Sequence, residues 1–145
     1  MTSPDPRAAF AAMTEALIQD FRAHRGQVTQ GPFAGRPVLL LTTTGVKTGA
    51  SRLAPLVYTR DGERYVIVAS KGGAPTHPAW YLNIVAHPEV AVEVGGETFA
   101  ARASVVEGAE RERLYERHAE VHPSFTDYQR RTSRVIPVVV LDRLG

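Results

Sequence analysis

The sequence contains no cysteine, and this absence removes several classes of site at once. Without a thiol there is no disulfide, no thiolate nucleophile and no cysteine-ligated metal. A chain without disulfides is compatible with a reducing compartment, and we expect the protein to lie in the cytoplasm. The five histidines show no recognisable metal-ligand spacing, so no metal site is predicted.

A strong charge of one sign and long apolar runs are also missing. The 17 Lys and Arg residues and 15 Asp and Glu residues give a formal net charge of +2 at pH 7. So small an excess, without a basic stripe, argues against a nucleic-acid partner. No apolar run approaches the roughly 20 residues that a membrane-spanning helix needs, and no signal-peptide pattern opens the chain. The 145 residues therefore suit one compact domain with a buried core.

Apolar residues recur at helical spacing near the amino terminus. Asp5 suits an N-cap, Pro6 suits the first helical position and Gly26 ends the pattern, which predicts a helix from about Pro6 to His24. Its apolar stripe consists of Phe10, Met13, Leu17, Ile18 and Phe21. Such a stripe is typical of a helix packed on a core. The alternative is an interfacial or partner-binding helix, although mixed charges on the polar face give little attraction to anionic lipid.

A glycine-rich linker leads into aliphatic and β-branched runs separated by turn residues. These runs predict strands near residues 38–43, 52–59, 65–69, 90–94, 97–106 and 135–141. Asp61-Gly62 and Gly95-Gly96 are typical of hairpin turns, and further helices are predicted near 78–86 and 109–121. Six strands joined mainly by hairpins favour a mainly β, α+β fold, an antiparallel barrel with peripheral helices. Residues 1–36 then form a helix and linker, and residues 37–145 form the barrel.

Two glycine-rich connections carry the clearest functional signal. Residues 45–52, Gly-Val-Lys-Thr-Gly-Ala-Ser-Arg, follow a predicted strand and combine two glycines with Lys47 and Arg52. Glycine lets the backbone approach an anion closely, while lysine and arginine supply a point charge and a bidentate fork. Residues 69–83 leave another strand through a small-residue loop that contains Lys71. Each loop alone is also compatible with an ordinary turn with solvated charges, but two such loops can converge on one phosphate-bearing ligand.

Together these segments resemble the deazaflavin-dependent nitroreductase family, actinobacterial enzymes of the flavin-reductase-like split-barrel superfamily that use coenzyme F420. The matching motifs are Thr43-Thr44-Gly45, Lys47-Thr48-Gly49, Arg52, Ala69-Ser70-Lys71-Gly72-Gly73 and His77-Pro78-Ala79-Trp80-Tyr81-Leu82-Asn83. The resemblance runs from about Pro37 to Leu141 and implies a split β-barrel of the FMN-binding type. It implies cofactor contacts from Lys47, Thr48, Gly49, Arg52, Ala69, Ser70, Lys71, Gly72, Trp80 and Asn83. The family's more basic pattern has another arginine where this chain has Val46, and Trp80 also suits a core anchor.

The resemblance implies catalytic roles for Tyr128, Ser70 and His122. In the nitroreductase that gives the family its name, three tyrosines line the substrate pocket before the last strand, where this chain has His122, Phe125 and Tyr128. Since phenylalanine cannot donate a proton, an acid must be Tyr128, His122, Ser70 or water. His122 is attractive because its reference pKa lies near neutrality, although an exposed loop histidine without function is the alternative. Ser70 has an alternative role in satisfying the loop backbone.

The activity implied by the resemblance is hydride transfer from reduced F420 to a quinone, an activated enone or a nitro compound. Two alternatives stay open: an FMN-dependent split-barrel reductase, and a non-catalytic protein that binds the deazaflavin or another anion. The loss of two pocket tyrosines keeps the non-catalytic alternative open. The sequence does not distinguish a monomer from a homodimer. Any membrane contact is expected to be peripheral, at the inner face of the cell membrane, through the N-terminal helix.

Overall fold

The structure is a computed structural model that describes residues 5–144. The first four residues of the predicted N-terminal segment and the last residue of the predicted barrel segment lie outside the described part. Within it, one antiparallel sheet has the strand order β2-β1-β5-β6-β7-β4-β3. The strands are β1 (Val38–Thr44), β2 (Ser51–Val57), β3 (Thr59–Asp61), β4 (Arg64–Val68), β5 (Glu89–Val94), β6 (Glu97–Val106) and β7 (Val138–Arg143). The helices are α1 (Pro6–Ala23), the 3-10 turn η1 (Lys71–Gly73), α2 (Ala79–Ala86), α3 (Gly108–Val121) and α4 (Ser124–Arg130).

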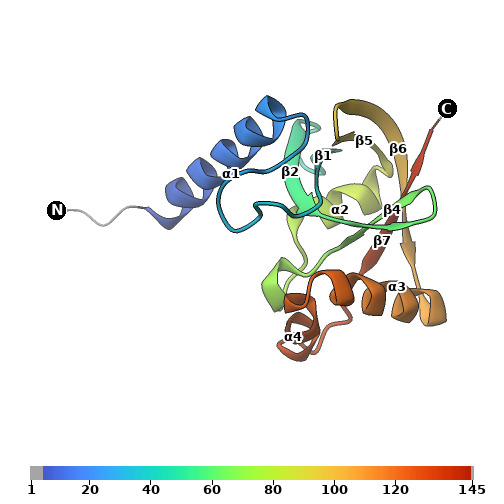
Figure 1. The fold of residues 1–145 in the computed structure, drawn as a ribbon. Helices are drawn as coiled ribbons and strands as arrows, with labels where there is room; N and C mark the ends of the chain where they lie inside the picture. The colour runs from blue at the N-terminus through green and yellow to red at the C-terminus, as the bar shows by residue number, and fades with distance from the viewer. Residues whose placement is uncertain (1–4, 145) are drawn as a thin grey trace.

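The strand order explains why this sheet curls into a split barrel. β2 and β3 are consecutive in the chain and separated only by Tyr58, yet they lie at the two ends of the strand order. The sheet must therefore curl until its edges meet at Tyr58, as Figure 1 shows. The Tyr58 N–H donates to the Pro37 carbonyl at 3.1 Å and holds the crossing in place. The fold class is confirmed, but the continuous strand predicted over residues 52–59 is wrong at this crossing, and β3 is absent from the predicted strands.

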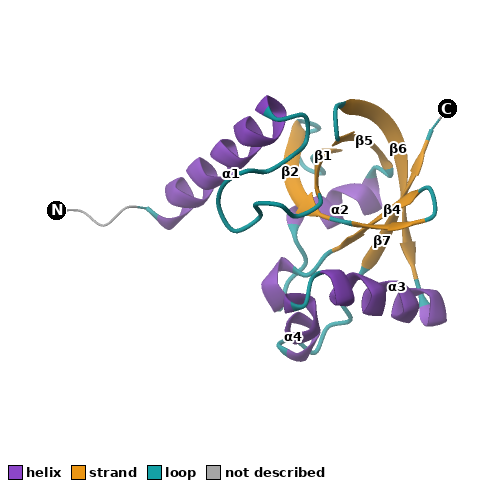
Figure 2. Cartoon of the chain, in the orientation of Figure 1, coloured by secondary structure: helices purple, strands orange, loops and turns teal. Residues whose placement is uncertain are grey.

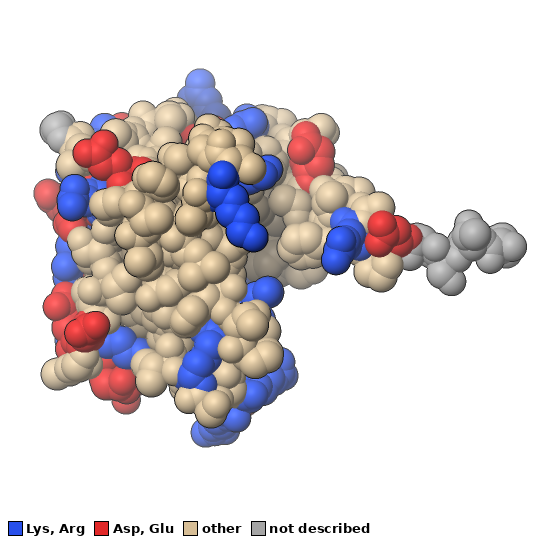
Figure 3. Space-filling view, turned by 180° about the vertical axis from the view of Figure 1, so that it is seen from behind, with Lys and Arg blue, Asp and Glu red and all other residues tan. Residues whose placement is uncertain are grey.

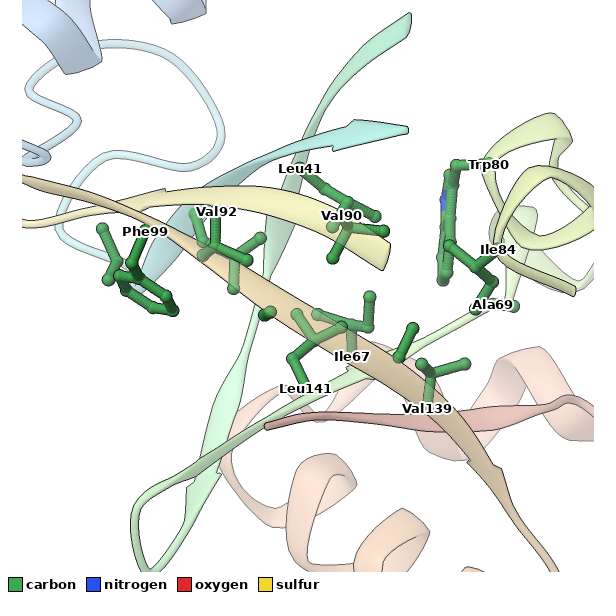
Figure 4. Packing of buried hydrophobic residues seen from close by; sticks show 14 residues of the cluster. Leu41, Ile67, Ala69, Trp80, Ile84, Val90, Val92, Phe99, Val139 and Leu141 are labelled. Carbon is green, nitrogen blue, oxygen red and sulfur yellow. The ribbon is translucent and has the colours of Figure 1, made fainter. Parts of the chain in front are cut away.

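The barrel interior is filled by alternate residues of the strands. In β6, Phe99, Ala101 and Ala103 are buried while the residues between them are exposed. β1 is covered on both faces: Leu39 and Leu41 face the interior, whereas Val38 and Leu40 pack with α1. Figure 4 shows Leu41, Ile67, Val92 and Leu141 converging from different strands, with Trp80 and Ile84 of α2 beside Val90.

Helices α1, α3 and α4 lie on the outer side of the curled sheet, whereas α2 lies within its curl, as Figure 2 shows. The outer residues of β4 and β7 pack against α3 and α4 in a second cluster that includes Leu114 and Phe125. α4 is absent from the predicted helices. The last strand begins at Val138 and not at residue 135, because Pro137 has no N–H for the ladder and its carbonyl instead accepts from the Ala69 N–H at 2.9 Å.

The N-terminal helix matches its predicted bounds to within one residue, and the Asp5 carboxylate caps it by accepting from the Arg7 N–H at 3.0 Å. Ile18 and Phe21 are buried against the sheet. Phe10 and Met13, however, are 72% and 61% exposed. The predicted packing of the whole stripe is therefore wrong for the amino-terminal half of α1, which projects beyond the barrel (Figure 1).

Two close backbone approaches define where α1 ends. The Gly26 N–H donates to the Phe21 carbonyl at 2.8 Å, with φ of +89°. A Cβ at Gly26 would lie 2.5 Å from the Gly95 carbonyl oxygen, so only glycine lets the helix end reach the β5–β6 turn. None of the helices in residues 5–144 has both the length and the apolar character needed to cross a bilayer.

Candidate functional site

The first glycine-rich loop joins β1 to β2 and is compact. The Gly45 N–H donates to the Ala50 carbonyl at 2.8 Å and closes the loop. Thr43 and Arg52 lie opposite each other in the two strands, so their side chains share one face of the sheet. Lys47 is exposed at the tip of the loop. The two predicted cations are therefore presented by one tight connection.

Thr48 and Gly49 shape this loop from within. The Thr48 hydroxyl accepts from the Ala50 N–H at 3.2 Å. Gly49 has φ of +69°, in the left-handed region, and its N–H donates to the Gly45 carbonyl at 2.9 Å. Their placement supports a role in the backbone shape of the predicted site.

The second loop has an unusual backbone at Lys71. Ser70 is right-handed, with φ of −78° and ψ of −40°, whereas Lys71 and Gly72 have φ of +47° and +64°. A left-handed lysine is uncommon and costs about 1 kcal/mol or more. A right-handed residue followed by a left-handed one directs successive N–H groups into a concavity that suits an anion. Within residues 5–144 the N–H groups of Lys71 and Gly72 donate no hydrogen bond.

Ser70 and the buried Ala69 begin this loop at the end of β4. Ser70 is 7% exposed, and its carbonyl accepts from the Gly73 N–H at 3.0 Å. Its hydroxyl forms no hydrogen bond with other described residues. The hydroxyl is therefore available to a bound molecule.

Asn83 ties α2 to the first loop. This buried side chain donates from Nδ2 to the Thr43 hydroxyl at 3.0 Å and accepts at Oδ1 from the Val46 N–H at 3.3 Å. Both ends of the amide are thus engaged within the protein. The structure places Asn83 as a brace behind the loop, a position that gives no support to its predicted direct contact with a cofactor.

Trp80 lies one turn before Asn83 on α2. It is buried in the barrel core with Ile84, Leu41 and Val90. This position fits the core anchor that the sequence allowed as an alternative to a cofactor contact.

The three predicted cations are not neutralised inside the chain. Lys47, Arg52 and Lys71 form no ion pair with any residue from 5 to 144, and Lys71 Nζ donates only to the Thr76 hydroxyl at 3.2 Å. Figure 3 shows a face that is largely uncharged in its middle, with basic side chains along its lower edge and acidic and basic side chains mixed along the edge away from α1. An anion can therefore bind these cations without displacing a carboxylate.

Tyr128 is brought to the second loop by the packing of α4. Gly73 has φ of +82°, and a Cβ there would lie 2.7 Å from the Tyr128 carbonyl oxygen. The half-buried Tyr128 ring packs edge-on against Phe125, with centroids 5.0 Å apart. Two of the predicted catalytic residues, Tyr128 and Ser70, therefore belong to segments that are in contact.

His122 lies elsewhere, in the protein interior. Its Nε2 donates to the Tyr58 carbonyl at 3.1 Å, and its ring lies 4.9 Å from that of His118. Burial, more than any other cause, lowers the pKa of His122. An exposed loop histidine is thus wrong for this position, and the buried neutral ring gives no support to the predicted proton-donating role.

Arg134 was not among the predicted site residues, yet its guanidinium contacts the second loop at several carbonyl oxygens. An arginine in an irregular segment before a strand has no local sequence signal of its own. Its partner His77 resembles a turn marker because it precedes a proline. The contact between Arg134 and His77 can be found only in the folded structure, where the loop and the segment before the last strand lie side by side.

A cavity of about 500 Å³ lies at the other end of β1, beside Pro37. Its lining includes Arg25, Arg36 and Tyr58 but none of the candidate cofactor residues. The candidate cofactor residues therefore lie on the two loops, away from this cavity.

Known proteins place the chain in a family. The family described as F420H(2)-dependent quinone reductase matches residues 15–143. A Mycobacterium tuberculosis protein named F420H(2)-dependent quinone reductase is 44% identical over 126 residues, 85% of each chain.

Two solved structures agree with this assignment. An F420-H2 dependent reductase, FDR-A, has a TM-score of 0.69 and 42% identity, covering 74% of this chain and 95% of its own. A domain-swapped dimer has a TM-score of 0.71 and 36% identity, covering 95% and 100%. The predicted F420-dependent reductase is confirmed, and the chain belongs to the F420H2-dependent quinone reductase family.

Proposed function

We propose that the two glycine-rich loops hold the F420H2 of this family member and that its acceptor is a quinone. The observation that carries the proposal is the set of cations without ion pairs, Lys47, Arg52 and Lys71, on two loops joined through α2 and Asn83. A phosphate with an acidic glutamate tail is a concentrated anion, and such a donor set fits it. When bound, the reduced deazaflavin supplies a hydride for a two-electron reduction.

The chain's own residues bind the anionic part of the cofactor and orient the acceptor. Lys47 and Arg52 bind from the first loop, while Lys71 binds from the second with its side chain and its N–H. The Ser70 hydroxyl donates to an acceptor oxygen as charge develops there. Tyr128, whose segment contacts the same loop, is our candidate proton donor.

Quinones are the acceptor class that the family description names. Activated enones and nitro compounds are further electron-poor acceptors suggested by the sequence resemblance. The sequence left open an F420-dependent reductase, an FMN-dependent reductase and a non-catalytic binding protein. The family description supports the F420-dependent reductase.

Reoxidation of reduced cofactor tests this proposal. The purified protein is mixed with F420H2 or with reduced FMN, and menadione is added. We expect menadione-dependent oxidation of F420H2, with KM for F420H2 raised at least tenfold in the Lys47→Ala/Arg52→Ala variant, because two charge-assisted contacts are lost. The matched control is Arg102→Ala/Arg117→Ala, which removes the same charge from exposed positions elsewhere. Turnover with FMN alone, or equal effects in both variants, would refute the proposal.

A second proposal concerns assembly as a homodimer by exchange of α1. Phe10 and Met13 are exposed on the half of α1 that projects from the barrel, and a solved relative is a domain-swapped dimer. Light scattering at several concentrations should give a dimer for the wild type and a monomer for Phe10→Asp/Met13→Asp. A monomeric wild type that sediments with anionic vesicles would instead support peripheral membrane attachment.

A further inference from the structure

Arg134 lies between α4 and β7, and among residues 5–144 its half-buried guanidinium forms hydrogen bonds with one segment only. Nε donates to the Ala74 carbonyl at 2.8 Å, and Nη2 donates to the Ser70 carbonyl at 2.7 Å. Nη1 donates to the Ala69 carbonyl at 3.1 Å and lies 3.1 Å from His77 Nδ1. All four contacts are to residues 69–77, the segment that contains the proposed cofactor loop.

The charge of Arg134 has no carboxylate partner. No ion pair joins it to any acidic residue among residues 5–144, and burial lowers the pKa of its guanidinium, the sign of a charge that has lost hydration. Partial burial of an arginine is unfavourable unless hydrogen bonds compensate. Here three backbone carbonyls and an imidazole compensate it, so the residue fixes a loop instead of balancing an acid.

The geometry of the peptide bond shows what this anchoring does. In a trans peptide the C=O and the following N–H point in opposite directions. Because the Ala69 and Ser70 carbonyls point to Arg134, the N–H groups of Ser70 and Lys71 point away from it. A cation behind these peptides also polarises them and strengthens their N–H groups as donors.

His77 reports on the same arrangement. Since Arg134 donates to His77 Nδ1, that nitrogen is unprotonated and the ring proton lies on Nε2. Burial first, and the Arg134 charge second, lower the pKa of His77. The ring packs on Tyr81 with centroids 4.6 Å apart, which holds it beside the guanidinium.

We propose that Arg134 is a positioning residue for the cofactor. It binds the carbonyl oxygens of residues 69, 70 and 74, so that the N–H groups of Ser70 and Lys71 face the anionic part of F420. This inference rests on the proposed function for its ligand, but the anchoring itself is a property of the chain alone.

The test compares Arg134→Lys and Arg134→Met with the control Arg130→Met, an exposed arginine of the same region. Lysine keeps the charge but cannot hold three carbonyls in a planar fork. Four readouts are needed: thermal unfolding, the Kd of oxidised F420 by fluorescence, kcat and KM for F420H2 with menadione, and the tautomer and titration of His77 by ¹⁵N NMR.

In both Arg134 variants we expect Kd and KM to rise about tenfold or more, with kcat changed by less than threefold, because fewer molecules hold the loop in the competent shape. In Arg134→Met the His77 Nδ1 also loses its donor, and the pKa of His77 rises because the Arg134 charge that helps to lower it is removed. Arg130→Met should match the wild type in every readout.

Folded Arg134 variants with wild-type Kd and KM would overturn the proposal, as would equal losses in Arg130→Met. If Arg134→Met does not fold, Arg134→Lys decides. A wild-type protein that fails to bind F420 would refute the proposed function instead. In that case an unchanged His77 tautomer and unchanged Ser70 and Lys71 amide signals in Arg134→Lys would refute the anchoring.

Discussion

The buried His118 side chain predicts that stability falls steeply on mild acidification. His118 is fully buried, with Nδ1 3.1 Å from the Thr59 hydroxyl, and its Nε2 has no hydrogen-bond partner among the described residues. Burial, and then the neighbouring His122, lower the pKa of His118 from 6.5 to about 3. Between these two pKa values His118 is protonated in the unfolded chain, where its pKa is ordinary, but stays neutral in the folded protein.

The direction and size of the effect follow from this difference. Because the folded-state pKa of His118 is depressed, the unfolded state binds more protons between about pH 6.5 and pH 3. The stability associated with neutral His118 is present above pH 6.5 and is lost as the pH falls through this window. The loss is about 2 kcal/mol at pH 5 and about 5 kcal/mol below pH 3. His122, whose pKa is also lowered by burial, changes stability in the same direction.

Denaturant unfolding at pH 7, 6, 5.5 and 5 measures this loss, since ordinary carboxylates titrate mainly below that range. The free energy of unfolding of the wild type should fall by about 2 kcal/mol or more from pH 7 to pH 5. His118→Gln should be less stable at pH 7 but show a clearly shallower pH dependence. The control His87→Gln, at an exposed position, should parallel the wild type. Equal slopes in His118→Gln and the wild type would refute the reasoning.

Other substitutions test how the loops are held. Gly73 has φ of +82°, and a Cβ added by Gly73→Ala would lie 2.7 Å from the Tyr128 carbonyl oxygen. We therefore expect Gly73→Ala to lower the free energy of unfolding by more than about 1 kcal/mol, measured by thermal unfolding, and to weaken F420 binding. Gly49 has φ of +69° with no atom within 4 Å of an added Cβ, so Gly49→Ala should lower the free energy of unfolding by only about 1 kcal/mol. An equal loss of stability in the two variants would contradict the close contact at Gly73. Asn83→Ala should lower the free energy of unfolding by about 1–3 kcal/mol and raise the Kd for F420, because the Val46 N–H and the Thr43 hydroxyl lose their partner. Unchanged F420 binding in a titration would show that Asn83 does not brace the cofactor loop.

Local signals predict much of this fold. The turn at Gly95-Gly96 forms as predicted, with Gly95 at a left-handed φ of +60°. The turn predicted at Asp61-Gly62 lies one residue later, at Gly62-Glu63, because Asp61 ends β3 and pairs with Arg64. Alternation along β6 and the caps of α1 are equally local. The crossing at Tyr58 is different: Val57-Tyr58-Thr59 keeps a strand-like composition while the chain changes its hydrogen-bonding partner from β1 to β4. Only the three-dimensional arrangement of the curled sheet shows that change.

The candidate site also contains some residues that local sequence signals predict and others that only long-range contacts place. The placement of Lys47, Arg52 and Lys71 follows from their loops, whose glycines are visible in the sequence. Asn83 and Arg134 act through partners 37 to 65 residues away, and no spacing along the chain indicates such contacts. His122 resembles a loop residue in sequence, but the helix end and Tyr58 enclose it.

Binding of F420 compared with a deazaflavin riboside that lacks the phosphate and tail tests the central claim most directly. The wild type should bind F420 at least tenfold more tightly than the riboside, because in the proposed site Lys47, Arg52 and Lys71 bind only the missing anionic part. In Lys47→Ala/Arg52→Ala this preference should shrink, with the Kd of the riboside unchanged. Equal affinity of the wild type for both compounds, or an undiminished preference in the variant, would contradict the placement of the cofactor on these loops.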